Sequence, residues 1–423
     1  MASVSDALPT LSTQGADASA WLVVAVVVAG AGMVAWFLRI FRVPGARLLA
    51  GIIVGVALGP TVLGRVAPAP WERMVIGGSA ERMVLQARQT EWKAWQLARG
   101  HVGVRTGESH DAEQEARSAA IAQAETAWRQ AVAEHQRPLG IAVLLLAGVV
   151  GGTAALGRPA DRGASGPTAI SIGLWSAGLP VLLGLVVLWW RRALLPAPSS
   201  LAVLAALAVG AWGLNAADRR AAGQTGRDGP ALIRGASAVA TLIAVGLLLT
   251  SLFRASATTS DLRHWLGLVG AAAVGWAGLV VLRRSAARLG TAAAPPEDRG
   301  PSHPLVRIVE MLAMPALAGL VALQADWIAD FSLWIVVGAV IASGDGRWTG
   351  AWIGGMLSGG RRPRDAARLA LGACGSGPLQ VAIAAIAVDA GLFPREWTVA
   401  ILFGAVATDL TAPVRRRFAQ IME

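Results

Sequence analysis

Eleven apolar segments, each of roughly membrane-spanning length, restrict the fold of this chain more than any other feature. A helix needs about 20 mostly apolar residues to cross a bilayer, and only helices or closed barrels satisfy the backbone inside it. These segments predict an all-α polytopic membrane protein with about 11 transmembrane helices, of which the ninth is unusually long. The segments are residues 21–41, 48–63, 139–156, 168–190, 201–217, 231–253, 264–282, 304–324, 331–358, 364–392 and 397–414.

Composition supports this class and excludes others. Hydrophobic residues make up 55% of the 423 residues and charged residues only 15%, which is not the balance of a soluble domain. The net charge of +11 comes from basic clusters at the ends of apolar segments, so it indicates topology and we expect no nucleic-acid partner. Cys374 is the only cysteine, and the five histidines lack ligand spacing, so neither a metal nor a cofactor is expected.

Arginine distribution predicts the orientation. Arginines concentrate in alternate connections between the apolar segments, from the one after residue 41 to the one after residue 414, and basic loops face the cytoplasm. We therefore expect a multi-pass protein of a bacterial-type inner membrane, with its N-terminus outside and its C-terminus in the cytoplasm.

A polar insert at residues 65–138 separates two transmembrane regions, residues 20–64 and 139–417. The insert is rich in Ala, Glu, Gln and Arg, with helical runs at residues 80–99 and 111–136. The first run is expected to end at Arg99 and Gly100, and the second at Pro138. We predict an antiparallel helical hairpin on the non-cytoplasmic side. Three tryptophans are expected to pack this hairpin either against itself or against a partner: Trp92, Trp95 and Trp128.

The tenth apolar segment, residues 364–392, carries a helix breaker at its centre. Gly375, Ser376, Gly377 and Pro378 follow one another there. Proline removes a backbone donor and glycine is a poor helix former, so backbone groups here are expected to lack helical partners. Interrupted helices mark binding sites in transporters, although an ordinary kinked membrane helix gives the same pattern.

Two charges stand near the middle of the ninth segment, where a charge costs about 2.5–3.5 kcal/mol. Asp345 and Arg347 lie two residues apart and point in different directions on a helix, so each is expected to seek a partner on another helix. The alternative is that residues 344–346 form a loop between two short spans, with both charges in water. The topology favours one long helix.

Several motifs resemble the monovalent cation:proton antiporters, the sodium/proton and potassium/proton exchangers. Residues 43–60, VPGARLLAGIIVGVALGP, are similar to an early glycine-rich helix of that family, and residues 311–355 look like its later helices. Residues 373–392 resemble its interrupted helix, and Arg347 falls where the family usually has a membrane-embedded lysine. The resemblance implies two inverted repeats with crossed broken helices, and it leaves a homodimer as an option.

The departures from the family concern the ion-binding acids. The central helix has Ala240 and Thr241 where the family has aspartates, and Asn215 is the only polar ligand candidate in the preceding broken helix. Ser376 and Gln380 occupy positions where many relatives have Arg and Glu. Asp345 is then the carboxylate left to carry a proton.

The resemblance implies a secondary transporter that exchanges a monovalent cation for protons, and not an enzyme. Two other functions stay open from the residues alone. The chain is either a transport-silent relative that acts as a structural or regulatory membrane partner through its hairpin, or a passive channel, which needs no titratable carboxylate.

Overall fold

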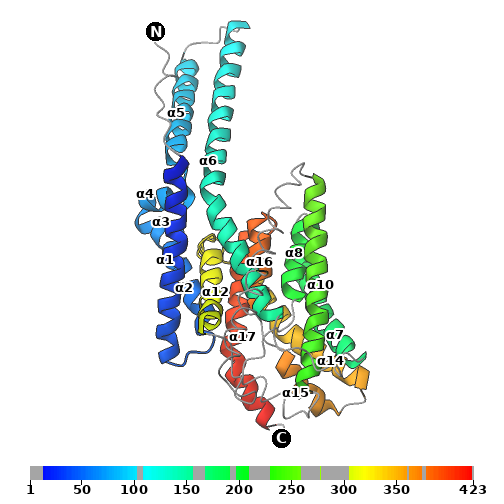
Figure 1. Ribbon diagram of the computed structural model, residues 1–423. Coiled ribbons are helices and arrows are strands. Elements are labelled where there is room, and N and C mark those ends of the chain that lie inside the picture. The colour runs from blue at the N-terminus through cyan, green and yellow to red at the C-terminus, as the bar shows by residue number, and fades with distance from the viewer. Residues whose placement is uncertain are drawn as a thin grey trace. The chain divides into compact units, whose positions relative to one another are not determined.

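The computed structural model describes residues 13–101, 108–155, 167–190, 197–208, 229–258, 277, 304–359, 362–373 and 378–421. Every regular element in these ranges is a helix (Figure 1). The chain divides into two compact units. The first comprises residues 1–26 and 63–140, and the second comprises residues 27–62 and 141–423.

The first unit contains the polar insert. It includes the start of α1 (Thr13–Ile40), most of α6 (Glu108–Ala155), and α3 (Leu63–Val66), α4 (Pro68–Trp71), η2 (Glu72–Ile76) and α5 (Ser79–His101). Helices α5 and α6 lie antiparallel: Gly78, before α5, packs near Trp128, and the guanidinium of Arg117 lies 5.5 Å from the ring centroid of Trp95. Both tryptophans pack the hairpin against itself.

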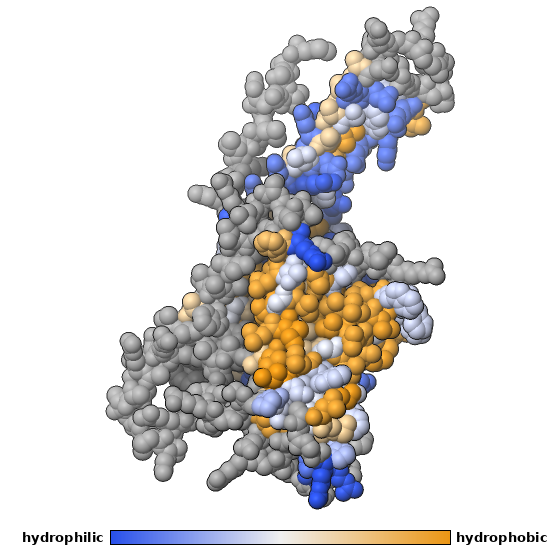
Figure 2. Space-filling model, turned by 90° about the vertical axis from the view of Figure 1, so that its right-hand side faces the viewer, coloured by the Kyte–Doolittle hydropathy of each residue, from blue (hydrophilic) through white to orange (hydrophobic). Residues whose placement is uncertain are grey.

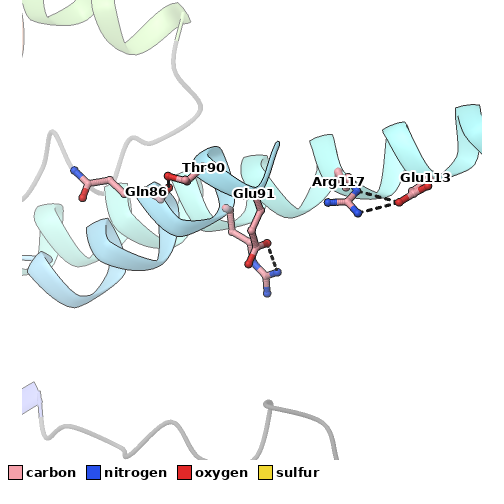
Figure 3. A network of polar contacts seen from close by, with 6 residues as sticks. Gln86, Thr90, Glu91, Glu113 and Arg117 are labelled. Carbon is pink, nitrogen blue, oxygen red and sulfur yellow. Dashed lines mark hydrogen bonds and ion pairs between the residues drawn. The ribbon is translucent and has the colours of Figure 1, made fainter. Parts of the chain in front are cut away.

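Ion pairs along each helix add to this pairing. Arg117 bonds Glu113 at 2.9 Å on α6, and Arg88 bonds Glu91 at 3.2 Å on α5 (Figure 3). Pairs three or four residues apart stabilise a helix by about 0.2–0.5 kcal/mol each. Arg88, Arg117 and Arg129 of the hairpin are therefore paired with carboxylates of their own helices.

Pro138 does not end its helix, contrary to the sequence prediction. Helix α6 continues through it to Ala155, so the second hairpin helix and the third apolar segment form one element. Proline inside a helix loses one hydrogen bond and costs about 3 kcal/mol. An Ala- and Glu-rich run precedes the proline and an apolar run follows it. Both runs favour helix, and together they offset the cost of the proline.

The second unit is a bundle in which glycines bring backbones together. A Cβ at Gly51 or Gly55 of α2 (Ala46–Leu58) would overlap the carbonyl oxygens of Pro315 or Gly319 on α12 (Pro304–Ala322). Small residues four apart allow membrane helices such close contact. The remaining helices are α7 (Pro167–Trp190), α8 (Ala197–Ala208), α10 (Gly229–Thr258), α13 (Leu333–Val340), η4 (Ile341–Gly346), α14 (Arg347–Gly359), α15 (Pro363–Ala373), α16 (Pro378–Asp389) and α17 (Arg395–Ile421).

Four of the described helices are long and apolar enough to cross a membrane. They are Ser19–Ile40, Ala46–Val66, Pro167–Trp190 and Ala236–Ala255. Shorter apolar helices cover Ser199–Ala208, Met311–Ala322 and Leu379–Asp389. An apolar band covers the face of the second unit in Figure 2. The predicted segment at residues 264–282 lies, apart from residue 277, outside the described residues.

The ninth and tenth segments set up the candidate site. Elements α13, η4 and α14 follow one another without a gap from Leu333 to Gly359, so residues 344–346 are not a loop. At about 1.5 Å per residue this helix is about 40 Å long. In the tenth segment α15 ends at Ala373 and α16 begins at Pro378, and the residues between them lie outside the described ranges.

Candidate functional site

The two charges of the ninth segment face in different directions. Asp345 is exposed, whereas Arg347 is completely buried. They lie at the end of η4, a π-helical stretch, and at the start of α14. Wider π turns inside α-helices are rare and frequently occur at functional sites.

Arg347 points into the bundle and contacts α8. Its Nη2 donates a hydrogen bond to the carbonyl oxygen of Leu207, at a distance of 3.1 Å. Leu207 is the penultimate residue of α8. The guanidinium thus donates to a backbone carbonyl inside an apolar cluster that includes Ala342, Ile383 and Ala384.

Gln380 is another fully buried polar side chain, in the first turn of α16. Neither its amide nitrogen nor its amide oxygen has a hydrogen-bond partner among the described residues. Helix α16 packs against α8, α12 and α17, so the amide lies in the interior of the bundle. An unsatisfied buried polar group costs about 1–3 kcal/mol, so this amide has unused capacity to bind a ligand.

Ser343 is a buried polar residue that the sequence analysis did not single out. Its hydroxyl is buried without a hydrogen-bond partner in the described part of the chain. A Cβ at Gly404 would lie 3.2 Å from its Oγ, so the hydroxyl faces α17. The only feature of the sequence that could have indicated Ser343 is its position, two residues before Asp345 within an apolar segment.

The other predicted site residues are placed as follows. Thr241 is on α10, and its hydroxyl donates to the carbonyl of Ser237 at 2.8 Å, within the same helix. Pro378 is the first residue of α16, as suits a residue without an N–H. Asn215, Gly375, Ser376 and Gly377 lie outside the described residues.

Three carboxylates outside the predicted site have local contacts. Asp326 accepts hydrogen bonds from the N–H groups of Ile328 and Ala329, and Asp330 accepts one from the N–H of Asp326. Asp409 packs beside Gly45, whose Cβ would lie 2.8 Å from that of the aspartate. Among the described residues, no group of three or more His, Cys, Asp or Glu side chains is placed to hold a metal.

Comparison with known proteins adds no assignment. The chain matches no protein-family model, and no curated protein sequence is significantly similar to it.

Proposed function

We propose that this protein is a secondary transporter that exchanges a monovalent cation for protons across a membrane. The observation that supports this proposal most directly is the state of the Gln380 amide. It is fully buried, and neither of its polar atoms has a hydrogen-bond partner among the described residues. In an apolar bundle such a group is a cost unless it binds something. The proposal includes the antiporter architecture, with eleven spans in two inverted repeats and the C-terminus in the cytoplasm.

The chemistry assigned to this site is that of neutral oxygens and one fixed cation. We assign the Gln380 amide oxygen on α16 and the Ser343 hydroxyl on η4 as candidate ligands for a cation that has lost part of its water shell, since both are buried without a partner among the described residues. Ser376 at the break and Asn215 are further candidate ligands. Arg347, fixed on the Leu207 carbonyl, has the role of a permanent positive charge.

Asp345 is the proposed proton carrier. It lies near the middle of the Leu333–Gly359 helix, about 18 Å from its start and about 21 Å from its end at the helical rise. Exchange requires one positive charge to leave as another enters, and a carboxylate that releases a proton when the cation binds satisfies this balance. Its exposure gives it access to a group outside the bundle interior.

A transport-silent relative is the second candidate, and one observation favours it. In the described residues, the completely buried polar groups of the bundle are a guanidinium, an amide and two hydroxyls, whereas Asp345 is exposed. A protein that has lost exchange could retain this polar interior for helix packing alone. A passive channel is a third possibility, since it requires no carboxylate in the interior.

Proton movement in everted vesicles tests the proposal. Added sodium or potassium should drive proton flux in vesicles that contain the unmodified protein, and Asp345→Asn should abolish it. Asp389→Asn, at the end of α16, and Asp409→Asn, within α17, are the controls and should retain nearly full flux. Equal amounts of each variant in the membrane exclude a folding defect. Absence of exchange in the unmodified protein would favour the silent relative, and unaltered exchange in Asp345→Asn would remove Asp345 from the site.

A further inference from the structure

One end of the second unit carries exposed arginines from three parts of the chain. Arg42 lies in the turn between α1 and α2, Arg362 and Arg364 lie at the start of α15, and Arg417 lies near the end of α17. All four side chains are exposed. We refer to these four residues as the arginine rim.

Contacts bring these elements to the same end. Gly45, in the turn that carries Arg42, packs beside Asp409 of α17, and α15 also contacts α17. In Figure 1 the last part of α17, α15 and the turn after α1 lie at the lower end of the second unit. The rim is therefore one feature of the fold, although its residues are far apart in the sequence.

The side chains of the arginine rim are available to a ligand. None of the four forms an ion pair or a hydrogen bond within the part of the chain that the structure describes. The hairpin differs, because there Arg88 and Arg117 pair with glutamates of their own helices. Among the described residues, no ion pair therefore neutralises the positive charge of these four side chains.

The rim lies at the edge of the apolar surface. Large exposed apolar side chains precede it on two helices: Phe37 and Ile40 on α1 and Leu357 on α14. The first turn of α15 is held in place, since the indole N–H of Trp352 donates to the carbonyl of Pro363 at 3.2 Å. Arg362 and Arg364 thus flank a fixed residue at the boundary between apolar and polar surface, which is the depth of lipid headgroups.

We propose that the arginine rim binds the headgroup phosphates of anionic phospholipids. A guanidinium offers a planar fork of N–H donors that matches phosphate oxygens, and arginines at a membrane surface attract anionic lipid. The ligand is lipid because the charges border the surface that faces hydrocarbon. This inference is independent of the proposed exchange, since it involves neither Asp345 nor Gln380.

Native mass spectrometry of the full-length protein tests the proposal by counting retained phosphatidylglycerol in detergent micelles. We compare the unmodified protein with Arg362→Gln/Arg364→Gln. Each arginine near a surface contributes about fivefold in lipid affinity, so the double variant should bind phosphatidylglycerol about 10- to 30-fold more weakly. Phosphatidylcholine should bind weakly to both proteins. An undiminished affinity in the double variant would overturn the proposal.

The matched control is Arg254→Gln/Arg395→Gln, which removes two exposed arginines near the C-terminal end of α10 and at the start of α17. This control variant should bind phosphatidylglycerol with an affinity within about twofold of that of the unmodified protein. An equal loss in this control would show a nonspecific charge effect and would also refute the assignment. Salt provides a second measurement on the unmodified protein: phosphatidylglycerol retention should fall as sodium chloride rises, and independence of salt would contradict phosphate binding.

Discussion

Replacing Gln380 with methionine should stabilise the protein. The amide is completely buried and neither of its polar atoms has a partner among the described residues, so the folded state carries a desolvation cost of about 1–3 kcal/mol. Methionine is unbranched, has a similar length and brings no group that needs a hydrogen bond, so packing against α8, α12 and α17 is retained. We expect Gln380→Met to raise the free energy of unfolding by about 1–2 kcal/mol.

The measurement is chemical unfolding of the purified full-length protein in detergent micelles with choline as the only added cation, so that no small cation occupies the site. Gln324→Met is the control, because Gln324 is exposed and its replacement should change the free energy by less than about 0.5 kcal/mol. Sodium or potassium should then stabilise the unmodified protein by mass action and not the Gln380→Met variant. A loss of more than about 1 kcal/mol in Gln380→Met would mean that the amide is held by stabilising bonds, which would refute this reasoning.

Two further predictions concern glycines, each with a control. Gly55→Ala should destabilise the bundle by about 1–3 kcal/mol, because its Cβ would overlap the Gly319 carbonyl; Gly246→Ala, where nothing lies within 4 Å, should be neutral or stabilising by up to about 1 kcal/mol in the same unfolding assay. Gly77 has a positive φ of 78°, and a Cβ there would overlap the His135 ring, so Gly77→Ala should make the hairpin sensitive to limited proteolysis. Gly391 has a similar φ of 66° but lies in open space, so Gly391→Ala should show only the backbone strain of about 1–2 kcal/mol. Equal effects within either pair would contradict the packing explanation.

Elements set by local composition were predictable from the sequence. The segment predicted at residues 168–190 corresponds to α7, which covers Pro167–Trp190, and the run at residues 80–99 corresponds to α5. Apolar length and helix propensity determine such elements without reference to the rest of the chain. Pro138 failed as a boundary because a breaker costs a fixed energy, whereas the two flanking runs of α6 both favour helix.

The candidate site was predictable only in part. The sequence indicates that Asp345 and Arg347 differ in direction, but not which of them enters the bundle, because that depends on how α13, η4 and α14 rotate against α7, α8 and α17. The contact between Arg347 and Leu207 joins residues 140 positions apart and has no signal in either segment. Ser343 was missed because a lone serine in an apolar segment is common, and only its burial without a partner makes it notable.

The exchange and silent functions differ in what the Gln380 amide does, so stability and activity must be measured together. Removing an amide that only fills space should stabilise the protein and change nothing else. Removing an amide that binds the transported cation should also stabilise the empty protein, because without its ligand the amide has no partner among the described residues. It should, however, abolish both cation-dependent stabilisation and exchange. A gain in stability with a loss of activity is the expected signature of a functional polar group in an apolar interior. The sign of the change in unfolding free energy in Gln380→Met therefore tests whether the amide is buried without a partner. Whether sodium or potassium still stabilises the variant then distinguishes the exchange function from the silent one.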